Sequence, residues 1–442
     1  MEEKEEAAWS AGLDVLRRLT EAGHPAYLVG GCVRDRLLGR RGGDIDIATA
    51  AEPTAVMSLF ADVLPTGLKH GTVTVREAGF GFEVTTFRQE SGYSDARHPD
   101  AVAFVRDVRE DLARRDFTVN AMAMDADGAL VDPFGGQADM RDRVLRAVGH
   151  AAERFGEDAL RMLRGIRFAA ELGYRIDEST WDGLLARRDK LRLVAMERVG
   201  AELDKMIGGA DPARALTLLS ESGLADRTAE PLPPAVVAGL RAAAGEMAAA
   251  MNAQGEPIGG DLRWAALFVG CGATAADVLA TLRVLRYAGR RAERIASVAR
   301  LHERLSGAIP GGPFGRRKAI AEGAGAIAGE AREGWIRAVL DFGREAARDW
   351  LRLAEAAPSA IALGGPDGPY REASRWLREM PAAAASELAV RGDELVRHAG
   401  LPAGPWVARH LRLLLEEVAL GRAANEKTVL LAAFASHLRK ER

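Results

Sequence analysis

Two aspartates separated by one isoleucine, Asp44-Ile45-Asp46, constrain the fold of this 442-residue chain more than any other feature. They follow the apolar run Tyr27-Leu28-Val29, the pair Gly30-Gly31 and a helix-forming run that begins at Cys32. This order predicts a strand, a glycine turn, a helix and a second strand. Because side chains alternate between the faces of a strand, Asp44 and Asp46 are expected on one face, with Ile45 and Ile47 pointing into a core.

The glycine turn predicts a binding place for phosphate. A turn that leads into a helix directs free backbone N–H groups and the positive end of the helix dipole toward a ligand above it. Gly30 and Gly31 are therefore candidate binding residues, and Arg34 would add positive charge.

Two carboxylates beside a phosphate predict a magnesium site, because Mg²⁺ is usually held by one or two carboxylates, substrate phosphates and water. Asp44 and Asp46 are thus the candidate metal ligands and catalytic residues. The alternative is a turn with two solvated acids, since such pairs occur by chance in many long chains. The glycine turn upstream favours the metal site.

A third acid lies in the β-rich run Phe82-Glu83-Val84-Thr85. Glu83 stands among apolar and β-branched residues, where an acid needs a partner. We expect it to be a third catalytic carboxylate. The alternative is an edge-strand residue that faces water.

The pattern of apolar residues changes after residue 145, from the strand period to the helix period, and this predicts an α+β fold. A small mixed-sheet head would be followed by helical units, with breaks at 230–234, 255–260, 310–313 and 364–369. The length suits two to four domains, and 48% hydrophobic residues suffice for their cores. We predict a catalytic head at 1–145, a neck at 146–215, a body at 216–370 and a tail at 371–442.

The two cysteines, Cys32 and Cys271, are far apart and belong to no metal-binding motif, so neither a disulfide nor a zinc site is expected. The acidic start does not resemble a signal peptide, and no run approaches the ~18 apolar residues of a membrane span. We therefore expect a cytoplasmic protein with no membrane association.

A net charge of −3 means that any nucleic-acid-binding surface has to be arranged locally. The clearest basic stretch contains Arg283, Arg286, Arg290, Arg291, Arg294, Arg300 and Arg304. On a pair of helices it would provide a face that follows RNA phosphates. The alternative is a solvated, arginine-rich helix.

Five motifs in order between residues 27 and 205 resemble those of the class II tRNA nucleotidyltransferase/poly(A) polymerase family. They are Leu28–Asp35, Gly43–Thr49, Arg114–Ala121, Glu157–Phe168 and Glu197–Glu202. Three C-terminal segments, Gly392–Leu395, Gly404–Val407 and Asn425–Lys427, resemble the end of Bacillus-type CCA-adding enzymes. The resemblance implies a polymerase-β-like nucleotidyltransferase head followed by all-helical neck, body and tail domains.

The resemblance also implies residue roles. Asp44 and Asp46 would bind Mg²⁺ beside Glu83, and Gly31 and Arg34 would hold the triphosphate. Seven further residues would contact the incoming nucleotide: Arg115, Asp116 and Asn120 at its ribose and phosphates, Asp158 and Arg161 at the base edge, and Arg164 and Arg167 next to them.

The base-reading role also has a physical argument. Asp158, Arg161 and Arg164 are spaced by three residues and would form a stripe on one helix. Cytosine and adenine each present an amino donor beside a ring acceptor, so one Asp–Arg pair can accept both and exclude uracil and guanine. The alternative is an ordinary surface salt bridge.

The activity implied by the resemblance is template-independent addition of CCA to the tRNA 3′ end from CTP and ATP, by two-metal nucleotidyl transfer. The tail would bind the acceptor and T-arm side of tRNA, and no protein partner is expected. Gln89–Ala113 is predicted to be a polar loop beside the site, or else a plain surface loop. Because C-only relatives have a shortened loop here, its length favours complete CCA addition. The alternatives are a poly(A) polymerase, a CC-only or A-only enzyme, and a catalytically silent RNA-binding module.

Overall fold

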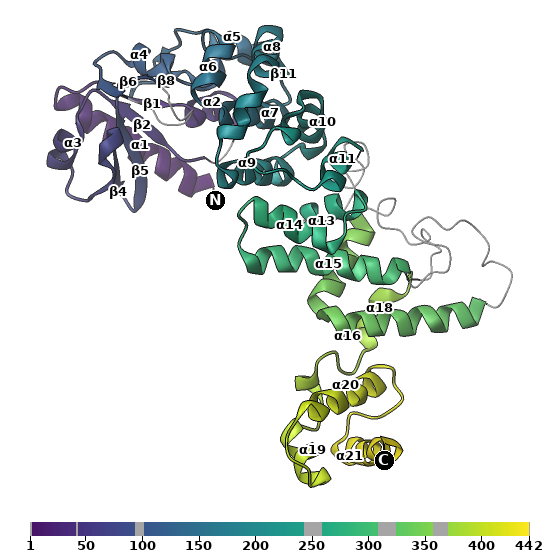
Figure 1. The fold of residues 1–442 in the computed structure, drawn as a ribbon. Coiled ribbons are helices and arrows are strands. Elements are labelled where there is room, and N and C mark those ends of the chain that lie inside the picture. The colour runs from purple at the N-terminus through teal and green to yellow at the C-terminus, as the bar shows by residue number, and fades with distance from the viewer. Residues whose placement is uncertain are drawn as a thin grey trace. The chain divides into compact units, whose positions relative to one another are not determined.

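The computed structural model describes residues 2–40, 43–92, 101–242, 259–307, 324–356 and 370–441. The chain forms two compact units, one of residues 1–211 and 217–231 and the other of residues 212–216 and 232–442. Within the described residues every strand lies in the first unit (Figure 1). A mixed sheet followed by a helical remainder confirms the predicted α+β fold, while the division into head, neck, body and tail stays a prediction.

The sheet of the first unit has seven strands in the order β3-β4-β5-β2-β1-β8-β9. Their bounds are Ala26–Val29 (β1), Asp46–Thr49 (β2), Val63–Gly67 (β3), Thr72–Glu77 (β4), Phe80–Thr86 (β5), Ala123–Met124 (β8) and Leu130–Val131 (β9). Only β2 and β5 pair in parallel, so the sheet is mixed as predicted. The strands that carry the acids are thus neighbours near its centre.

The predicted strand, glycine turn and helix are confirmed. β1 ends at Val29, and α2 runs from Gly31 to Leu37. Gly30 has a φ of +77°, and a Cβ atom on it would lie 2.8 Å from Nη1 of Arg115. Both the backbone angle and this close approach favour glycine at the turn.

The two faces of the sheet bury different cores. On one face, α1 (Glu2–Glu21) and α3 (Pro53–Leu59) pack on apolar side chains of the strands, among them the fully buried Ile47, with Ile45 at the margin. On the other face, α4 (Val108–Ala113) covers Ala48 and its neighbours. The isoleucines therefore point into a core as predicted, and Asp46 projects on the Ala48 side.

Helices follow the sheet in the first unit. They are α5 (Gly136–Arg141), α6 (Ala151–Glu157), α7 (Leu160–Leu172), α8 (Glu178–Arg187) and α9 (Met196–Gly208), with α10 (Pro212–Ser222) at its boundary. A short parallel pair of β10 (Val144–Leu145) with β11 (Arg175–Ile176) interrupts them. This pair is a small departure from the all-helical neck, because two residues are too few to produce a strand period in the sequence.

The regular secondary structure of the second unit, within its described residues, is all helical. Its α-helices are α11 (Pro234–Ala242), α13 (Gly260–Gly270), α14 (Ala275–Val284), α15 (Gly289–Gly307), α16 (Ala324–Ala356), α18 (Ala373–Glu379), α19 (Gly392–Ala399), α20 (Pro405–Ala419) and α21 (Lys427–Glu441).

The helix α16 is interrupted at Gly343, whose φ is +89°. The rings of Trp335 and Trp350 lie 5.4 Å apart, whereas fifteen residues of a straight helix span about 22 Å. The two halves, 324–342 and 344–356, therefore fold back on each other at this glycine.

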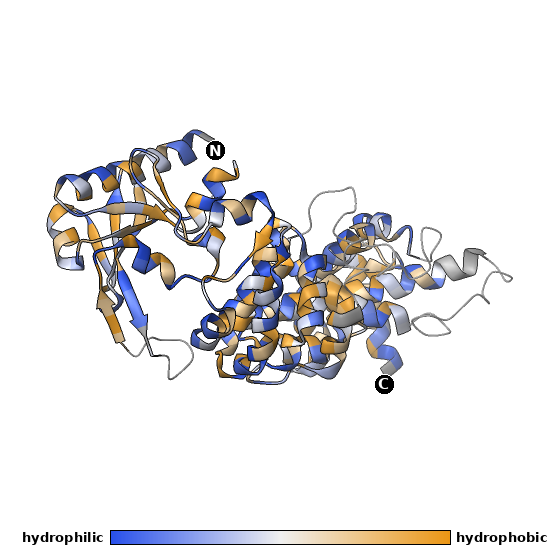
Figure 2. Cartoon of the chain, turned by 90° about the horizontal axis from the view of Figure 1, so that it is seen from above, coloured by the Kyte–Doolittle hydropathy of each residue, from blue (hydrophilic) through white to orange (hydrophobic). Residues whose placement is uncertain are grey.

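The segment Gln89–Ala113, predicted to be a loop, is largely ordered as secondary structure. β6 (Arg88–Ser91) and β7 (Ala101–Phe104) form an antiparallel pair, and α4 follows. Figure 2 shows β6 as hydrophilic and β7 as hydrophobic. The loop prediction was wrong for these residues because the polar sequence of β6 hides its strand pairing, and residues 93–100 lie outside the described part.

No helix in the described part of the chain is long and apolar enough to cross a membrane.

Close packing of α6 on α8 generates a stability prediction. A Cβ atom on Gly183 would lie 2.6 Å from Cβ of Ala151 and 2.9 Å from the backbone nitrogen of Ala152. We expect Gly183→Ala to lower the free energy of unfolding by about 1–3 kcal/mol through overpacking. Gly208→Ala in α9, where nothing lies within 4 Å of an added Cβ, should instead leave stability unchanged or raise it by up to ~1 kcal/mol. Urea unfolding of both variants checks this, and equal midpoints would contradict it.

Candidate active site

A pocket of about 510 Å³ in the first unit is lined by all the predicted site residues except Glu83. The residues that it brings together are Gly30, Gly31, Arg34, Asp44, Asp46, Arg115, Asp116, Asn120, Asp158, Arg161, Arg164 and Arg167. They come from the turn after β1 and the helix α2, from the segment that leads into β2, from the segment after α4, and from α7 with the turn before it. Side chains separated by more than a hundred residues in the sequence thus share one cavity.

Glu83 stands beside this pocket rather than in its lining. It is opposite Asp46 in the parallel register of β2 with β5, and it is exposed. Its charge still acts on the site, because it is one of the groups that raise the pKa of Asp46.

The carboxylate of Asp46 is electrostatically unfavourable in the protein alone. Burial raises its pKa from 3.8 to about 6 and outweighs the opposing effect of Arg115, while the charges of Glu83 and Asp44 raise it further. Asp46 therefore lies beside two like charges with too little positive charge to compensate.

These acids fit a divalent cation whose remaining ligands come from elsewhere. Within the described residues, no three acidic, histidine or cysteine side chains are grouped closely enough to form a metal cage by themselves. Mg²⁺ seldom uses such a cage, since it takes one or two carboxylates together with substrate phosphates and water. Asp44 and Asp46, which share the pocket, match that donor set.

Arg34 is held rigidly at the base of the pocket. Its guanidinium donates to both carboxylate oxygens of Asp35, at 2.9 Å each, and also to Oδ1 of Asn120. Only 7% of Arg34 is exposed. The turn after β1 and the segment that carries Asn120 are thereby joined through one arginine.

Asp116 forms the centre of a second buried contact. Its Oδ2 accepts from Nε of Arg164 at 2.8 Å, and its Oδ1 accepts from Nδ2 of Asn120 at 3.1 Å. Burial by itself would raise the pKa of Asp116, but Arg164 and Asn120, with help from Arg161, hold it at about 2. Asp116 is therefore ionised at all physiological pH values and fixes the guanidinium of Arg164.

Arg115 is a positive charge that acts on Asp46. Its Nη2 reaches Asp111 at 3.5 Å, and its charge lowers the pKa of Asp46. Its buried Nε has no hydrogen-bond partner. A buried donor without a partner is costly, and this one lines a pocket where an anionic ligand would satisfy it.

The predicted base-reading stripe is wrong in one respect. Asp158 lies between α6 and α7 with a φ of −132°, and α7 begins only at Leu160. Its Oδ1 accepts from the backbone N–H of Leu160 at 3.0 Å, so the acid lies in the turn that precedes the helix and is not part of it. Acceptor side chains favour this position because they satisfy N–H groups left free at the helix start.

Asp158 and Arg161 are each held by other residues. Arg198 on α9 donates to both oxygens of Asp158, at 2.8 and 3.3 Å. Arg161 donates to Glu157 at 2.9 Å and to the backbone oxygen of Arg114 at 2.9 Å. Both side chains are thus oriented in the pocket without forming a salt bridge to each other.

Arg167 is mainly a structural residue of the pocket wall. It donates to Glu202 at 2.7 Å and to Glu171 at 3.0 Å, and only 7% of it is exposed. The ring of Phe168 lies below it at 4.1 Å and also faces Arg34 and Arg164 at 5.2 Å. One aromatic ring therefore stabilises three cations of the site.

The sequence analysis missed several lining residues. Arg198 is the most important of these, and Phe168, Asp35 and Arg114 also line the pocket. Each belongs to one of the quoted motifs, so motif membership was an available signal. Which motif residues point into the cavity depends on packing, which spacing alone does not give.

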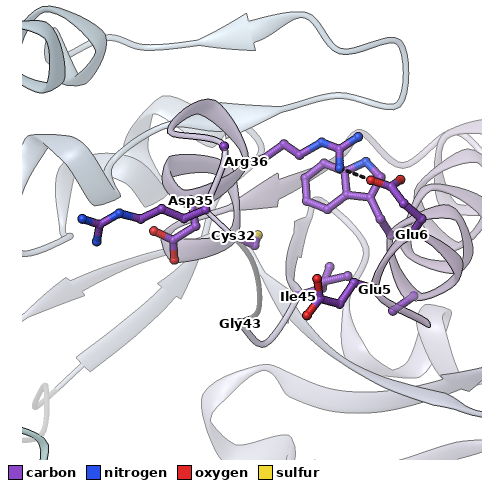
Figure 3. Close-up of a pocket in the computed structure, with 11 residues that line it drawn as sticks. Glu5, Glu6, Cys32, Asp35, Arg36, Gly43 and Ile45 are labelled. Carbon is purple, nitrogen blue, oxygen red and sulfur yellow. Dashed lines mark hydrogen bonds and ion pairs between the residues drawn. The ribbon is translucent and has the colours of Figure 1, made fainter. Parts of the chain in front are cut away.

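A neighbouring pocket of about 430 Å³ shares Cys32, Asp35 and Gly43 with the site but contains none of the other candidates. Figure 3 shows Arg36 and Glu6 meeting there, with an ion pair of 2.5 Å. The guanidinium of Arg36 also lies 4.8 Å from the ring of Trp9. Arg36 and Glu6 neutralise each other there, and the predicted site residues line the other pocket.

Three family models match parts of this chain. Residues 26–146, which contain the acids and the glycine turn, match the poly A polymerase head domain. Residues 173–231 match a model described as a probable RNA- and SrmB-binding site of polymerase A. Residues 340–434 match a second domain of tRNA nucleotidyltransferases.

Whole-length relatives agree with these matches. The chain is 37% identical over 418 residues to the CCA-adding enzyme of Geobacillus stearothermophilus, with 94% of each chain covered. It is 48% identical over 218 residues to that of Lactiplantibacillus plantarum, covering 49% of this chain and 54% of the relative. The crystal structure of the Bacillus stearothermophilus CCA-adding enzyme in complex with CTP superposes with a TM-score of 0.79 at 33% identity, covering 98% of both chains. The chain therefore belongs to the family of Bacillus-type CCA-adding enzymes, the tRNA nucleotidyltransferases.

Proposed function

We propose that this enzyme adds CCA to the 3′ end of tRNA, using CTP and ATP without a nucleic-acid template. The observation that carries the proposal is the single pocket that joins two metal-binding acids, arginines for a triphosphate, and an Asp–Arg set for a base. A relative of 33% identity is known in complex with CTP, and a structure with the same fold, from Thermotoga maritima, is complexed with tRNA.

The reaction is attack of the tRNA 3′-hydroxyl on the α-phosphate of the nucleotide, with pyrophosphate leaving. Asp44 and Asp46, with Glu83 beside them, would hold Mg²⁺. When bound, this metal lowers the pKa of the attacking hydroxyl and neutralises charge on the phosphates. Arg34, Arg115 and Arg164 would bind the triphosphate oxygens.

The network around Asp116 positions two of these groups before the substrate arrives. Asp116 is ionised and binds Arg164 and Asn120, and Asn120 in turn accepts from Arg34. Because these side chains are fixed in the free protein, less conformational freedom is lost when the nucleotide binds.

Base selection would rest on Asp158 and Arg161. The carboxylate of Asp158 accepts from the base amino group, and the guanidinium of Arg161 donates to the ring acceptors. Arg198 orients the acid, while Glu157 and the backbone of Arg114 orient the arginine. The same arrangement suits cytosine and adenine and opposes uracil and guanine.

Complete CCA addition is favoured over CC-only addition because the segment from β6 to α4 is present at length. A silent RNA-binding module is disfavoured because the acids and arginines converge on one pocket. We place this activity in the cytoplasm and expect no protein partner. The alternative activity, that of a poly(A) polymerase, shares the head domain, and its product distinguishes it from a CCA-adding enzyme.

Product length decides among these activities. We would give purified protein three tRNA transcripts, ending before CCA, after C and after CC, with CTP, ATP or both. Arrest after CCA is expected. Unlimited addition of A would indicate a poly(A) polymerase. A stop at CC, or addition of only the last A, would indicate a partial enzyme. No incorporation would indicate a silent module.

Asp46 should show opposite effects on activity and stability. Asp46→Asn and Asp46→Ala should lower nucleotide addition by roughly a thousandfold through loss of metal binding, with tRNA binding retained. Because the folded pKa of Asp46 is about 6, above its unfolded value, the ionised acid lowers stability as the pH rises from about 4 through 6.

Without metal at pH 8, the free energy of unfolding of Asp46→Asn should therefore be higher than that of the parent protein by about 1–2 kcal/mol. Urea unfolding measures this difference. Added Mg²⁺ should stabilise only the parent. Near-full activity of either variant would contradict the metal assignment.

Arg198 should determine the fidelity of base selection. Removing its two hydrogen bonds frees the Asp158 carboxylate, so Arg198→Ala should reduce discrimination of CTP against UTP by about tenfold or more. Single-turnover incorporation with each nucleotide measures this. Arg192→Ala, an exposed arginine nearby in the chain, is the matched control and should discriminate as the parent does.

A further inference from the structure

We propose that a pocket between α16 and α18, in the second unit, binds backbone phosphate of the RNA substrate. The inference rests on the proposed function for the identity of the RNA. The pocket has a volume of about 470 Å³, and four arginines line it: Arg344, Arg348, Arg352 and Arg378. They are called the arginine cluster below.

The fold gathers these residues on one side of a helix. Arg344, Arg348 and Arg352 are four residues apart in the second half of α16, so they project from one face at a rise of about 6 Å each. Arg378 comes from α18, which packs against that face. The apolar side chains of Leu351 and Leu377 complete the wall, and Ser374 supplies a hydroxyl group.

One member of the arginine cluster is an anchor. Arg344 donates to the backbone oxygens of Leu377 and Met380, at 3.2 and 3.0 Å, and to Glu387 at 3.3 Å. These bonds hold the second half of α16 against the end of α18. They also neutralise the charge of Arg344, so its contribution is mainly to position the other three.

The other three arginines keep their charge available. Arg348, Arg352 and Arg378 are exposed, and none forms an ion pair with any residue in the described part of the chain. Acids adjacent to them in sequence bind other arginines, Asp349 with Arg294 at 3.1 Å and Glu379 with Arg375 at 2.7 Å, although the charge of Arg378 also helps to lower the pKa of Glu379. No acidic side chain among the described residues lines the pocket. It is therefore a concave surface with excess positive charge.

The basic stretch predicted from the sequence is less suitable. Its arginines at 291, 294 and 300 pair with Asp261 at 2.6 Å, with Asp349, and with Glu293. The pocket beside them also contains acids. The positive charge that a protein of net charge −3 needs for RNA is thus better provided by the arginine cluster.

Phosphate is the ligand class that this geometry favours. Several guanidinium groups around one cavity match the many acceptor oxygens of phosphate, and each can donate two hydrogen bonds. Free pyrophosphate has the same chemistry, but the proposed substrate is a polyanion that gains affinity with every phosphate contact. We therefore assign the RNA backbone.

The test compares full-length Arg348→Ala/Arg352→Ala with the parent protein in CCA addition. The KM for tRNA should rise about tenfold while the KM for CTP and the kcat at saturating tRNA stay unchanged. The slope of log affinity against log salt should become shallower by about 1.5, since each lost phosphate contact removes about 0.7–0.9. Arg348→Lys/Arg352→Lys, which keeps the charges, should recover most of the affinity.

The control is Arg17→Ala in α1, an exposed arginine that already pairs with Asp14 at 2.8 Å. It should change neither the KM nor the salt slope. An unchanged KM and slope in the double alanine variant would overturn the proposal. Calorimetric loss of pyrophosphate binding with an unchanged KM for tRNA would assign a free-anion site instead.

Two further measurements cover a loss of folding and a loss of activity. If the double alanine variant loses helical circular dichroism, the single variants Arg352→Gln and Arg378→Gln carry the same test. If the parent protein incorporates no nucleotide, the proposed function fails, and tRNA binding in a filter assay still shows whether the arginine cluster contributes. Equal binding by parent and variant there would reject the cluster.

Discussion

The ion pair between Asp116 and Arg164 is the interaction on which the site depends. Asp116 is buried in this pair while Arg164 is partly exposed, and the pair joins the segment after α4 to α7. Through Asn120 it extends to Arg34 and hence to the turn after β1. A buried carboxylate stabilises a fold only when its hydrogen bonds are satisfied, and Asn120 and the backbone N–H of Phe117 satisfy those of Asp116. The same ion pair thus helps to specify the fold and to fix the side chains of the pocket.

Some charged groups of the pocket have partners within the chain, and others do not. Asp116 and Asp158 are held by arginines and are already paired in the free protein. The negative charge of Asp46 has too little positive charge near it, and the buried Nε of Arg115 has no hydrogen-bond acceptor. Groups that build the pocket are therefore satisfied within the chain, and groups proposed to meet the metal and the nucleotide are not. Unsatisfied groups at a site are a cost in stability that a ligand removes.

Local chemistry made much of this structure predictable. The glycine turn, the alternation of Asp46 with Ile47 and the positions of the arginines follow from spacing and backbone geometry. Asp158 was misplaced because an acid just before a helix and an acid in its first turn have the same spacing in the sequence. The β6–β7 pair and the arginine cluster depend on contacts between distant or polar segments, which periodicity does not encode. The role of Arg198 likewise depends on how α9 packs.

The break at Gly343 also fixes the direction in which the arginines of α16 point. The arginine face of α16 starts at the residue after this glycine, so its direction is counted from the bend. Because a helix turns by about 100° per residue, one inserted residue just beyond the bend would swing that face well away from α18. Insertions within the first half of α16 would leave the count unaltered. Length variation immediately after the glycine should therefore be rare.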